Sequence, residues 1–283
     1  MFNLEKNSVV TMVLVSFLLL LAACGANSSH ASESSSPASS PTAPAADSLK
    51  QVELTVSAAA SLTDALKEIQ PTFEAANPDI KLSLNFGASG ALQQQIEQGA
   101  PVDLFLSSAK KNMAALVDKQ LIDEAHQANL LTNELVVVVP QDSKANIAGI
   151  ADLTREELNK IAIGIPESVP AGNYAKEALT NARLWDALQP KLVQAKDVRQ
   201  VLQYVETGNA DAGFVYRTDA MTSDKSSIAF AVDPAIYTPV EYPIGIVKKT
   251  KRTAEAEALY SYLQSQAATD VFVKYGFSAS AAP

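Results

Sequence analysis

The sequence predicts an α/β protein of two lobes, each built on a mainly parallel β-sheet, around a central cleft. From residue 52 onward, short apolar runs typical of buried strands alternate with amphipathic stretches of helical period. A second series of the same alternation begins at residue 134 with "ELVVVVP". Two successive series of strands and helices indicate two α/β units rather than one extended sheet.

The first series has three strands and three helices in alternation. "VELTVSA" is predicted to be a buried strand, and the next stretch places Leu62, Ala65, Leu66, Ile69 and Phe73 on one helical face. Asn77 and Pro78 are expected to end that helix. The series continues with the alternating strand "DIKLSLNF", the helix "ALQQQIEQG", the strand "VDLFLSS" and a helix near "KNMAALVDKQ". This order favours parallel strands joined by crossover helices.

The second series runs from "ELVVVVP" to "AGFVY". It includes the strands "IAIGI" and "KLVQA" and the helical stretches "PAGNYAKEALTNA" and "DVRQVLQYVETGN". After it, "VEYPIGIV" is predicted to be a strand, and "TAEAEALYSYLQSQAATDVFVKYGF" to be helical. Between the two series, "DEAHQANL" is predicted to be a solvated helix or loop.

The composition restricts the class of partner. Apolar residues make up 47% of the 283, enough for a substantial core, and the formal net charge is −9. A net negative charge argues against nucleic acid or an anionic membrane as the main partner. An anionic ligand would need a local positive potential at its site.

The N-terminus predicts export and lipid attachment. Residues 1–23 have the apolar segment of a signal peptide, which ends in small residues before Cys24, the only cysteine. This end looks like the lipobox of a bacterial lipoprotein, so we expect lipidation of Cys24; an ordinary cleaved signal with an incidental cysteine is the alternative. Residues 24–51 are rich in Ser, Pro and Ala and are predicted to be a disordered tether, in which His30 has no role.

Four tight corners between predicted strands and helices are the candidate binding site. They are "AAAS", "GASG", "VPAG" and "AKDV", which place Ser61, Ser89, Ala171 and Val198 at or near helix starts. The first amides of a helix lack intrahelical acceptors and carry a partial positive charge, so they bind anions without a cationic side chain. Ligands of open α/β sheets also gather at such corners.

Each corner has a purely structural alternative. Ser61 with Asp64 could be an N-terminal cap, and Pro170 could simply start a helix. Asp197 could cap the following helix, and Tyr216 could be an ordinary buried aromatic at a strand end. The joint occurrence of all these features in one chain favours a binding site.

Enzyme interpretations have little support in the sequence. His126 is the only histidine after the tether, and no base is evident for Ser61 or Ser89 as a nucleophile. There is no Cys/His cluster for zinc and no phosphate-binding G-x-x-x-x-G-K-[ST] loop. We therefore expect no catalytic residue, no cofactor and no directly bound metal.

Several segments together resemble the molybdate-binding component of ABC importers. They are "AAASLTDAL", "FGASGALQQQIEQGAPVDLFLSSA", "ELVVVVP", "IGIPESVPAGNYAKEAL", "AKDVRQVLQYVETGNADAGFVYRTDA" and "VEYPIGIV" with "LQSQAATDVFVKYGF". The resemblance runs in order over nearly all of residues 52–277. It implies a type II periplasmic-binding-protein fold, with residues 52–131 plus 244–283 in the first lobe and 135–238 in the second.

The resemblance also implies a ligand and its contacts. Molybdate or tungstate would be held by Ser61 and Ser89 through hydroxyl and amide, by the amides of Ala171 and Val198, and by the phenol of Tyr216. The second corner has fewer serines than is usual in the family, since Ala88 and Gly90 flank Ser89. The implied partners are an ABC permease and its cytosolic ATPase. We expect a monomer anchored outside the cell membrane by its lipid alone and binding no nucleic acid.

Two other functions stay open from the residues alone. One is capture of another oxyanion or a small carboxylate on the same scaffold. The other is a surface enzyme that uses Ser61 or Ser89 as its nucleophile.

Overall fold

Two β-sheets carry the fold in the computed structural model, which describes residues 51–280. The first sheet has six strands in the spatial order β11-β4-β10-β3-β1-β2. They are β1 (Val52–Ala59), β2 (Ile80–Gly87), β3 (Leu104–Leu106), β4 (Ile122–Asn133), β10 (Val240–Val247) and β11 (Ser278–Ala279). The associated helices are the 3-10 turn η1 (Ala60–Leu62), α1 (Thr63–Ala76), α2 (Ser89–Glu97), α3 (Lys110–Asp118), α8 (Thr253–Leu263) and α9 (Gln266–Lys274). We call this sheet and its helices the first lobe.

The second lobe is built on a five-stranded sheet in the order β7-β6-β8-β5-β9. Its strands are β5 (Leu135–Pro140), β6 (Ile161–Gly164), β7 (Leu192–Ala195), β8 (Ala212–Tyr216) and β9 (Ser226–Ala231). Its helices are α4 (Pro170–Asn181), α5 (Trp185–Leu188), α6 (Val198–Glu206) and α7 (Arg217–Ala220), with the 3-10 turns η2 (Ile150–Thr154), η3 (Gln189–Lys191) and η4 (Pro234–Ile236).

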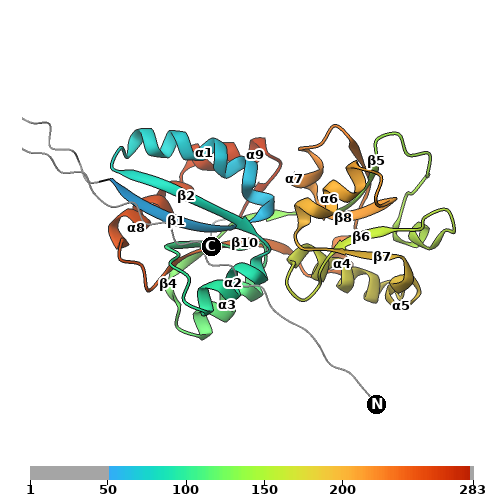
Figure 1. The fold of residues 1–283 in the computed structure, drawn as a ribbon, viewed down its shortest axis with the longest axis horizontal. Coiled ribbons are helices and arrows are strands. Elements are labelled where there is room, and N and C mark those ends of the chain that lie inside the picture. Colours follow the sequence, from blue (N-terminus) through green and yellow to red (C-terminus); the bar gives the residue numbers. More distant parts are fainter. Residues whose placement is uncertain (1–50, 281–283) are drawn as a thin grey trace, which may run out of the picture. The chain divides into compact units, whose positions relative to one another are not determined.

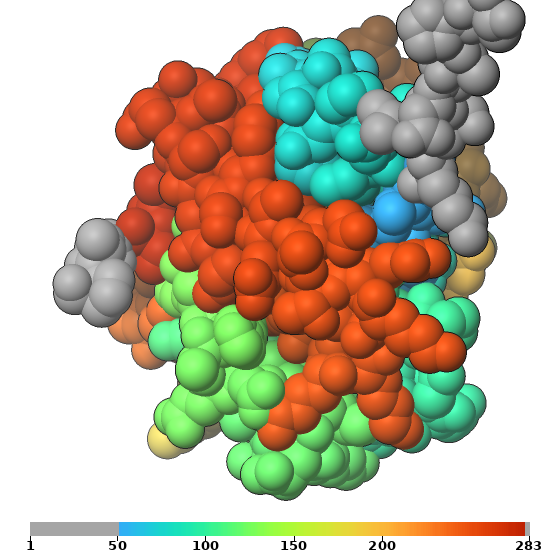
Figure 2. Space-filling view, turned by 90° about the vertical axis from the view of Figure 1, so that its left-hand side faces the viewer, coloured from blue at the N-terminus to red at the C-terminus, as the bar shows by residue number. Residues whose placement is uncertain are grey.

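Helices cover both faces of each sheet (Figure 1). In the first lobe α1 and α9 pack together on one face, and α2 and α3 pack together on the other. In the second lobe α4 and α6 lie on opposite faces. Figure 2 shows α8, in orange, lying between chain from the region of α1, in cyan, and chain leading into β4, in green.

The predicted core positions are confirmed. The apolar face of α1 is buried, with Leu62 and Phe73 fully inaccessible, and the helix ends before Asn77 as expected. β5 is buried along Leu135–Val138, which explains its unbroken apolar run, because it lies between β8 and β9 in the sheet and helices cover both of its faces. The two C-terminal helices, α8 and α9, are also as predicted.

The two-lobed α/β class is confirmed, but the sheets are mixed rather than mainly parallel. In the first sheet β1 is parallel to β2 and β3, whereas β10 is antiparallel to β3 and β4. In the second sheet β6 is parallel to β7 and β8, whereas β5 is antiparallel to β8 and β9. The reason is topological: β5 and β10 each arrive from the other lobe, at the carboxyl ends of the parallel strands, and must run in the opposite direction.

The prediction for "DEAHQANL" is wrong, because these residues belong to strand β4. Most of the middle of β4 is partly or fully exposed, including His126. A half-exposed strand carries polar residues, and its sequence therefore resembled a solvated segment.

The predicted signal peptide (1–23), Cys24 and residues 24–50 of the predicted tether lie outside the described residues. β4 and β10 belong to the first sheet and β5 to the second, while the lobe boundaries given above remain a proposal. Within residues 51–280, no helix combines the length and the apolar character needed to span a membrane.

Candidate functional site

A small cavity lies where the carboxyl ends of parallel strands from both sheets meet. It has about 190 Å³ of space free of atoms, including space open to solvent, and all five predicted site residues line it: Ser61, Ser89, Ala171, Val198 and Tyr216. The other lining residues are Ala60, Gly87, Ala88, Ser108, Val169 and Pro170. The lining contains hydroxyls, backbone and small apolar groups and no charged side chain.

The wall from the first lobe presents serine hydroxyls that already have partners in the protein. Ser61 Oγ lies 2.8 Å from the hydroxyl of Tyr242, a residue of β10. Ser89 Oγ accepts a hydrogen bond from the amide of Ser108 at 3.0 Å and lies 3.2 Å from Ser108 Oγ. Ser61 is 3% exposed and Ser89 is 0% exposed, so both hydroxyls are fixed in a buried setting.

The structural alternatives for two of the corners have different outcomes. Ser61 does not cap α1, because the N-cap position is Leu62 and no side chain accepts a hydrogen bond there. Asp197 does cap α6, since its Oδ1 accepts from the amide of Gln200 at 2.9 Å. A cap of this kind also fixes the helix start at Val198, and it is compatible with a ligand at the first amides.

The wall from the second lobe presents helix starts. Val198 is the first residue of α6, and Ala171 follows Pro170, the first residue of α4. Both therefore lie in the first turn, where amides have no intrahelical acceptor and the helix dipole is positive. Pro170 has no backbone N–H, so it starts α4 without adding another free donor.

Tyr216 contributes a buried hydroxyl without a partner. It ends β8 and is 1% exposed, and its phenol oxygen has no well-aligned hydrogen-bond partner among the described residues, although the Ser108 side chain acts to lower its pKa. Burial raises the pKa of this phenol well above its usual value, which already lies above neutral pH, and the protonated hydroxyl is a hydrogen-bond donor. A buried polar group left unpaired is costly, which makes Tyr216 a group that a polar ligand in the cavity would satisfy.

A guanidinium lies near the cavity but is turned towards carboxylates. Arg199 Nε is 2.7 Å from Asp219 Oδ1, and one of its terminal nitrogens is 2.7 Å from Asp64 Oδ2. Burial raises the pKa of Asp219 to about 6, although the neighbouring Arg199 acts in the opposite direction. Arg199 is thus balanced by two acids and leaves the cavity lining neutral.

Three hydrogen bonds beside the cavity join the lobes. The amide of Gly90 donates to the carbonyl of Ser168 at 3.0 Å, and Tyr174 donates through its hydroxyl to the carbonyl of Ser108 at 3.3 Å. Arg199 Nη2 donates to the carbonyl of Ser61 at 3.4 Å. The small cavity is therefore enclosed by contacts between the two lobes.

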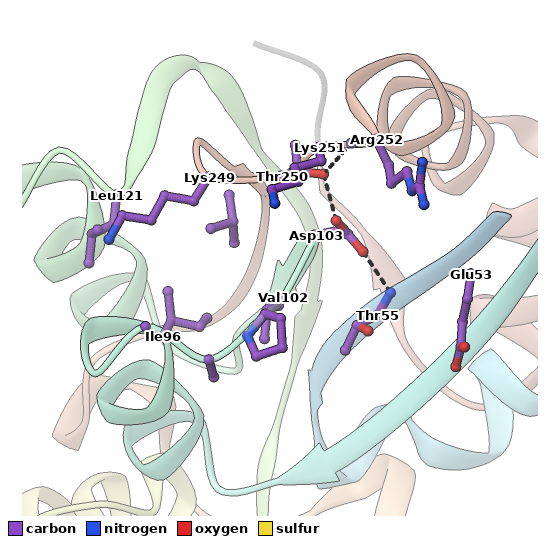
Figure 3. A pocket seen from close by; sticks show the side chains of 14 residues that line it. Glu53, Thr55, Ile96, Val102, Asp103, Leu121, Lys249, Thr250, Lys251 and Arg252 are labelled. Atoms are coloured by element: carbon purple, nitrogen blue, oxygen red, sulfur yellow. Dashed lines mark hydrogen bonds between the residues drawn. The ribbon is translucent and has the colours of Figure 1, made fainter.

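A larger hollow of about 1050 Å³ lies elsewhere in the first lobe and holds none of the predicted residues (Figure 3). Its central acid, Asp103, accepts from the amide of Thr55 at 2.8 Å and from the hydroxyl of Thr250 at 2.5 Å. Because Asp103 is satisfied by the protein itself, its carboxylate gives no sign of a missing ligand.

The sequence prediction missed three residues around the site: Ser108, Tyr242 and Arg199. Ser108 follows β3, and its position at a strand end was a usable signal. Tyr242 and Arg199 come from elements far apart in the sequence from their partners, Ser61 and Asp64, so only the fold brings them together.

The arrangement offers donors for an anion and little for catalysis. Ser61 and Ser89 bond to Tyr242 and Ser108 rather than to an imidazole or carboxylate, and His126 is exposed on β4. Across residues 51–280, no group of three or more His, Cys, Asp or Glu is placed to hold a metal ion. A tetrahedral oxyanion is the class of ligand that hydroxyls, amides and a phenol can surround.

Comparisons with known proteins agree with this geometry. Residues 54–278 match the family model described as bacterial extracellular solute-binding protein. The chain is 46% identical over 275 residues to a Bacillus subtilis protein that bears the name of an ABC transporter substrate-binding lipoprotein, YvgL, with 97% of this chain and 99% of that protein covered. It is 40% identical over 235 residues to the molybdate-binding protein ModA of Escherichia coli, with 80% and 89% covered.

A solved structure supports the fold. The chain is similar, with a TM-score of 0.64 and 42% identity, to a Clostridium difficile structure named as the substrate-binding domain of a molybdenum ABC transporter. The match covers 81% of this chain and 99% of that structure. The type II periplasmic-binding-protein fold expected from the sequence is confirmed, and the chain belongs to the family of bacterial extracellular solute-binding proteins.

Proposed function

We propose that this protein captures molybdate, and also tungstate, outside the cytoplasm and delivers it to an ABC importer. The observation that carries the proposal is the convergence of uncharged donors from both lobes on one cavity, with the Tyr216 hydroxyl left without a partner. The names of the ModA relatives and of the Clostridium difficile structure point to the same ligand. We infer no catalytic activity and no cofactor.

Each site residue has a distinct part in binding. The hydroxyls and amides of Ser61 and Ser89 would donate from the first lobe, and the amides of Ala171 and Val198 from the second. Tyr216 would donate a hydrogen bond from its phenol hydroxyl, which keeps its proton. Because the donors come from both lobes, the ligand stabilises the closed arrangement over an open one.

Selectivity would come from size. A cage of fixed donors suited to long metal–oxygen bonds leaves a smaller anion such as sulfate with stretched hydrogen bonds and an uncompensated desolvation cost. Tungstate is close to molybdate in size and charge, so the same cage would accept both.

The N-terminal region would keep the protein at the membrane. We propose that residues 1–23 are removed, that Cys24 is lipidated, and that the tether up to residue 51 leaves the folded part free to reach the permease. A cytosolic ATPase would drive release into the cell. We infer a monomer with two lobes, residues 52–131 with 244–283 and residues 135–238.

Thermal unfolding with a panel of anions tests the ligand. A ligand at about a thousand times its dissociation constant adds about 4 kcal/mol to the free energy of unfolding, which for a domain of this size raises Tm by about 10 °C. We expect such a shift with molybdate and tungstate and none with sulfate or phosphate at equal ionic strength.

Other outcomes would favour the other functions. Equal shifts with sulfate or phosphate would indicate a general oxyanion carrier, and a shift with small carboxylates alone would indicate a different ligand. Turnover of ester substrates that is lost in Ser61→Ala would indicate an enzyme.

A further inference from the structure

We infer that Arg199 is a positioning residue that links the two walls of the cavity and, through Asp64, slows the opening of the closed form. The inference rests on the proposed function, because its consequence is the residence time of the captured anion. Arg199 lines neither the cavity nor the larger hollow of the first lobe.

Arg199 is fixed within the second lobe. It is the second residue of α6, directly after Val198, and its Nε lies 2.7 Å from Asp219 Oδ1. Its Nη1 donates to the hydroxyl of Thr222 at 3.0 Å. Asp219 is fully buried and also accepts from the amide of Tyr216 at 3.3 Å. The carboxylate of Asp219 therefore fixes the position of Arg199 relative to two proposed ligand-binding residues, Val198 and Tyr216.

The free end of the same guanidinium reaches the first lobe. Its Nη2 lies 2.7 Å from Asp64 Oδ2 and donates to the carbonyl of Ser61 at 3.4 Å. Asp64 is in the first turn of α1, three residues after Ser61. Arg199 therefore contacts the corner of Ser61, whose hydroxyl is proposed to bind the ligand. It also directly follows Val198, whose amide is proposed to bind the ligand from the second lobe.

This ion pair differs from the other contacts that enclose the cavity. Those of Gly90 with Ser168 and of Tyr174 with Ser108 are neutral hydrogen bonds. Among the ion pairs of residues 51–280, the pair of Arg199 and Asp64 joins a helix of the first lobe to a helix of the second. Its two side chains are 26% and 37% exposed, although Asp64 Oδ2 itself is buried, so water can reach both partners once the contact opens, as suits a reversible contact.

The charges around Arg199 assign it a positioning role rather than that of a counter-ion. Two carboxylates, Asp64 and Asp219, face one guanidinium, so the group as a whole is not positive. If Arg199 acted on a bound dianion only through its electric field, neutralising Asp64 would leave more positive potential near the cavity. The dianion would then bind more tightly. If the bridge mattered, the same change would release the dianion faster. The two accounts therefore predict opposite signs.

The test is the dissociation rate of molybdate from the full chain carrying Cys24→Ser, measured by stopped flow. We expect Asp64→Asn to release molybdate about threefold faster, as for loss of a partly exposed ion pair, and Asp64→Glu to restore part of the difference. The matched control is Glu97→Gln, which breaks the 2.7 Å pair with Lys119 inside the first lobe and should leave the rate unchanged. Equal or slower release from Asp64→Asn would overturn the inference.

A second measurement separates this inference from the proposed function. Spin labels at Lys67→Cys in α1 and Lys196→Cys before α6, both exposed positions, report the distance between the lobes without any ligand. We expect Asp64→Asn, and not Glu97→Gln, to broaden that distance distribution towards longer values. If molybdate does not bind at all, the proposed function fails while this comparison still decides the role of Arg199; an unchanged distribution would contradict it.

Discussion

The two walls of the cavity differ in how complete they are without a ligand. In the first lobe, the hydroxyls of Ser61 and Ser89 are partnered by Tyr242 and Ser108. In the second lobe, Tyr216 has no partner for its hydroxyl, and Val198 stands at the start of α6. The hydroxyls of the first wall are therefore already hydrogen-bonded within the protein, whereas the donors of the second wall would gain hydrogen bonds from a bound anion.

Two acids, partly buried Glu74 in the first lobe and fully buried Asp219 in the second, differ in how well the protein satisfies them. Burial would raise the pKa of Glu74 in α1, but hydrogen bonds from the Leu82 amide, Lys81 and Gln70 lower it to about 2. In the second lobe, burial raises the pKa of Asp219 to about 6 even with Arg199 beside it. Several donors therefore stabilise the charge of Glu74, whereas burial outweighs the partners of Asp219. The difference teaches that removing a partnered hydroxyl of the first wall should affect folding and binding together, whereas removing the unpartnered hydroxyl of the second wall should affect mainly binding.

The largest effect is expected where the walls meet, at Gly90. A Cβ there would lie 2.6 Å from the carbonyl oxygen of Ser168, so the closed form of Gly90→Ala must shift its backbone. Overpacking of this kind costs about 1–3 kcal/mol, and here the cost falls on the contact between lobes rather than on either lobe alone. We expect molybdate binding, measured by calorimetry, to weaken by about 10- to 100-fold while Tm without ligand changes little.

Gly149→Ala is the control for Gly90→Ala, because a Cβ at Gly149 meets nothing within 4 Å. Its binding should match that of the wild type. Wild-type affinity in Gly90→Ala would mean that the close contact with Ser168 is not part of the ligand-bound form.

The next effect compares the walls directly, through Tyr216→Phe and Ser61→Ala. Each removes a donor to a charged ligand and should weaken binding by roughly 1–3 kcal/mol. Only Ser61→Ala also breaks a hydrogen bond of the free protein, with Tyr242, so we expect it to lower the free energy of unfolding by about 1 kcal/mol. Tyr216→Phe should leave that free energy unchanged or raise it, because the lost hydroxyl has no partner. Titration with molybdate and urea unfolding without it give the two quantities; equal losses of stability would remove the contrast between the walls.

The sequence predicted the local parts of this site well. Strand ends, helix starts and small residues are set by nearby sequence, so Ser61, Ser89, Ala171, Val198 and Tyr216 could all be named, and the structure brings them to one cavity. The role of Gly90 was not apparent, since its reason is the carbonyl of Ser168 on the other lobe.

What could not be predicted depends on contacts between distant segments. Strand directions in the mixed sheets follow from how β5 and β10 enter, which periodicity does not record. The partnership of Arg199 with Asp64 and Asp219 joins three helices, and no spacing along the chain indicates it. Strand β4 was missed because its polar, half-exposed residues lack a clear alternation.

The smallest effect concerns the acid dependence of stability, through Glu74→Gln. The pKa of Glu74 in the folded protein, about 2, lies below the usual glutamate value of 4.5, so ionised Glu74 stabilises the fold fully above about pH 4.5 and loses that contribution as the pH falls towards 2. Asp219 has the opposite sign: its pKa of about 6 exceeds 3.8, so its contribution to the stability of the fold is present at low pH and is lost as the pH rises through 6.

We expect Glu74→Gln to lower the free energy of unfolding by about 1 kcal/mol at pH 6 and to flatten the fall of that free energy between pH 4.5 and pH 3, as measured by urea unfolding. Glu257→Gln, at an exposed site of α8, should keep the wild-type pH profile. A wild-type slope in Glu74→Gln would mean that the hydrogen bonds around Glu74 do not set the acid stability of the first lobe.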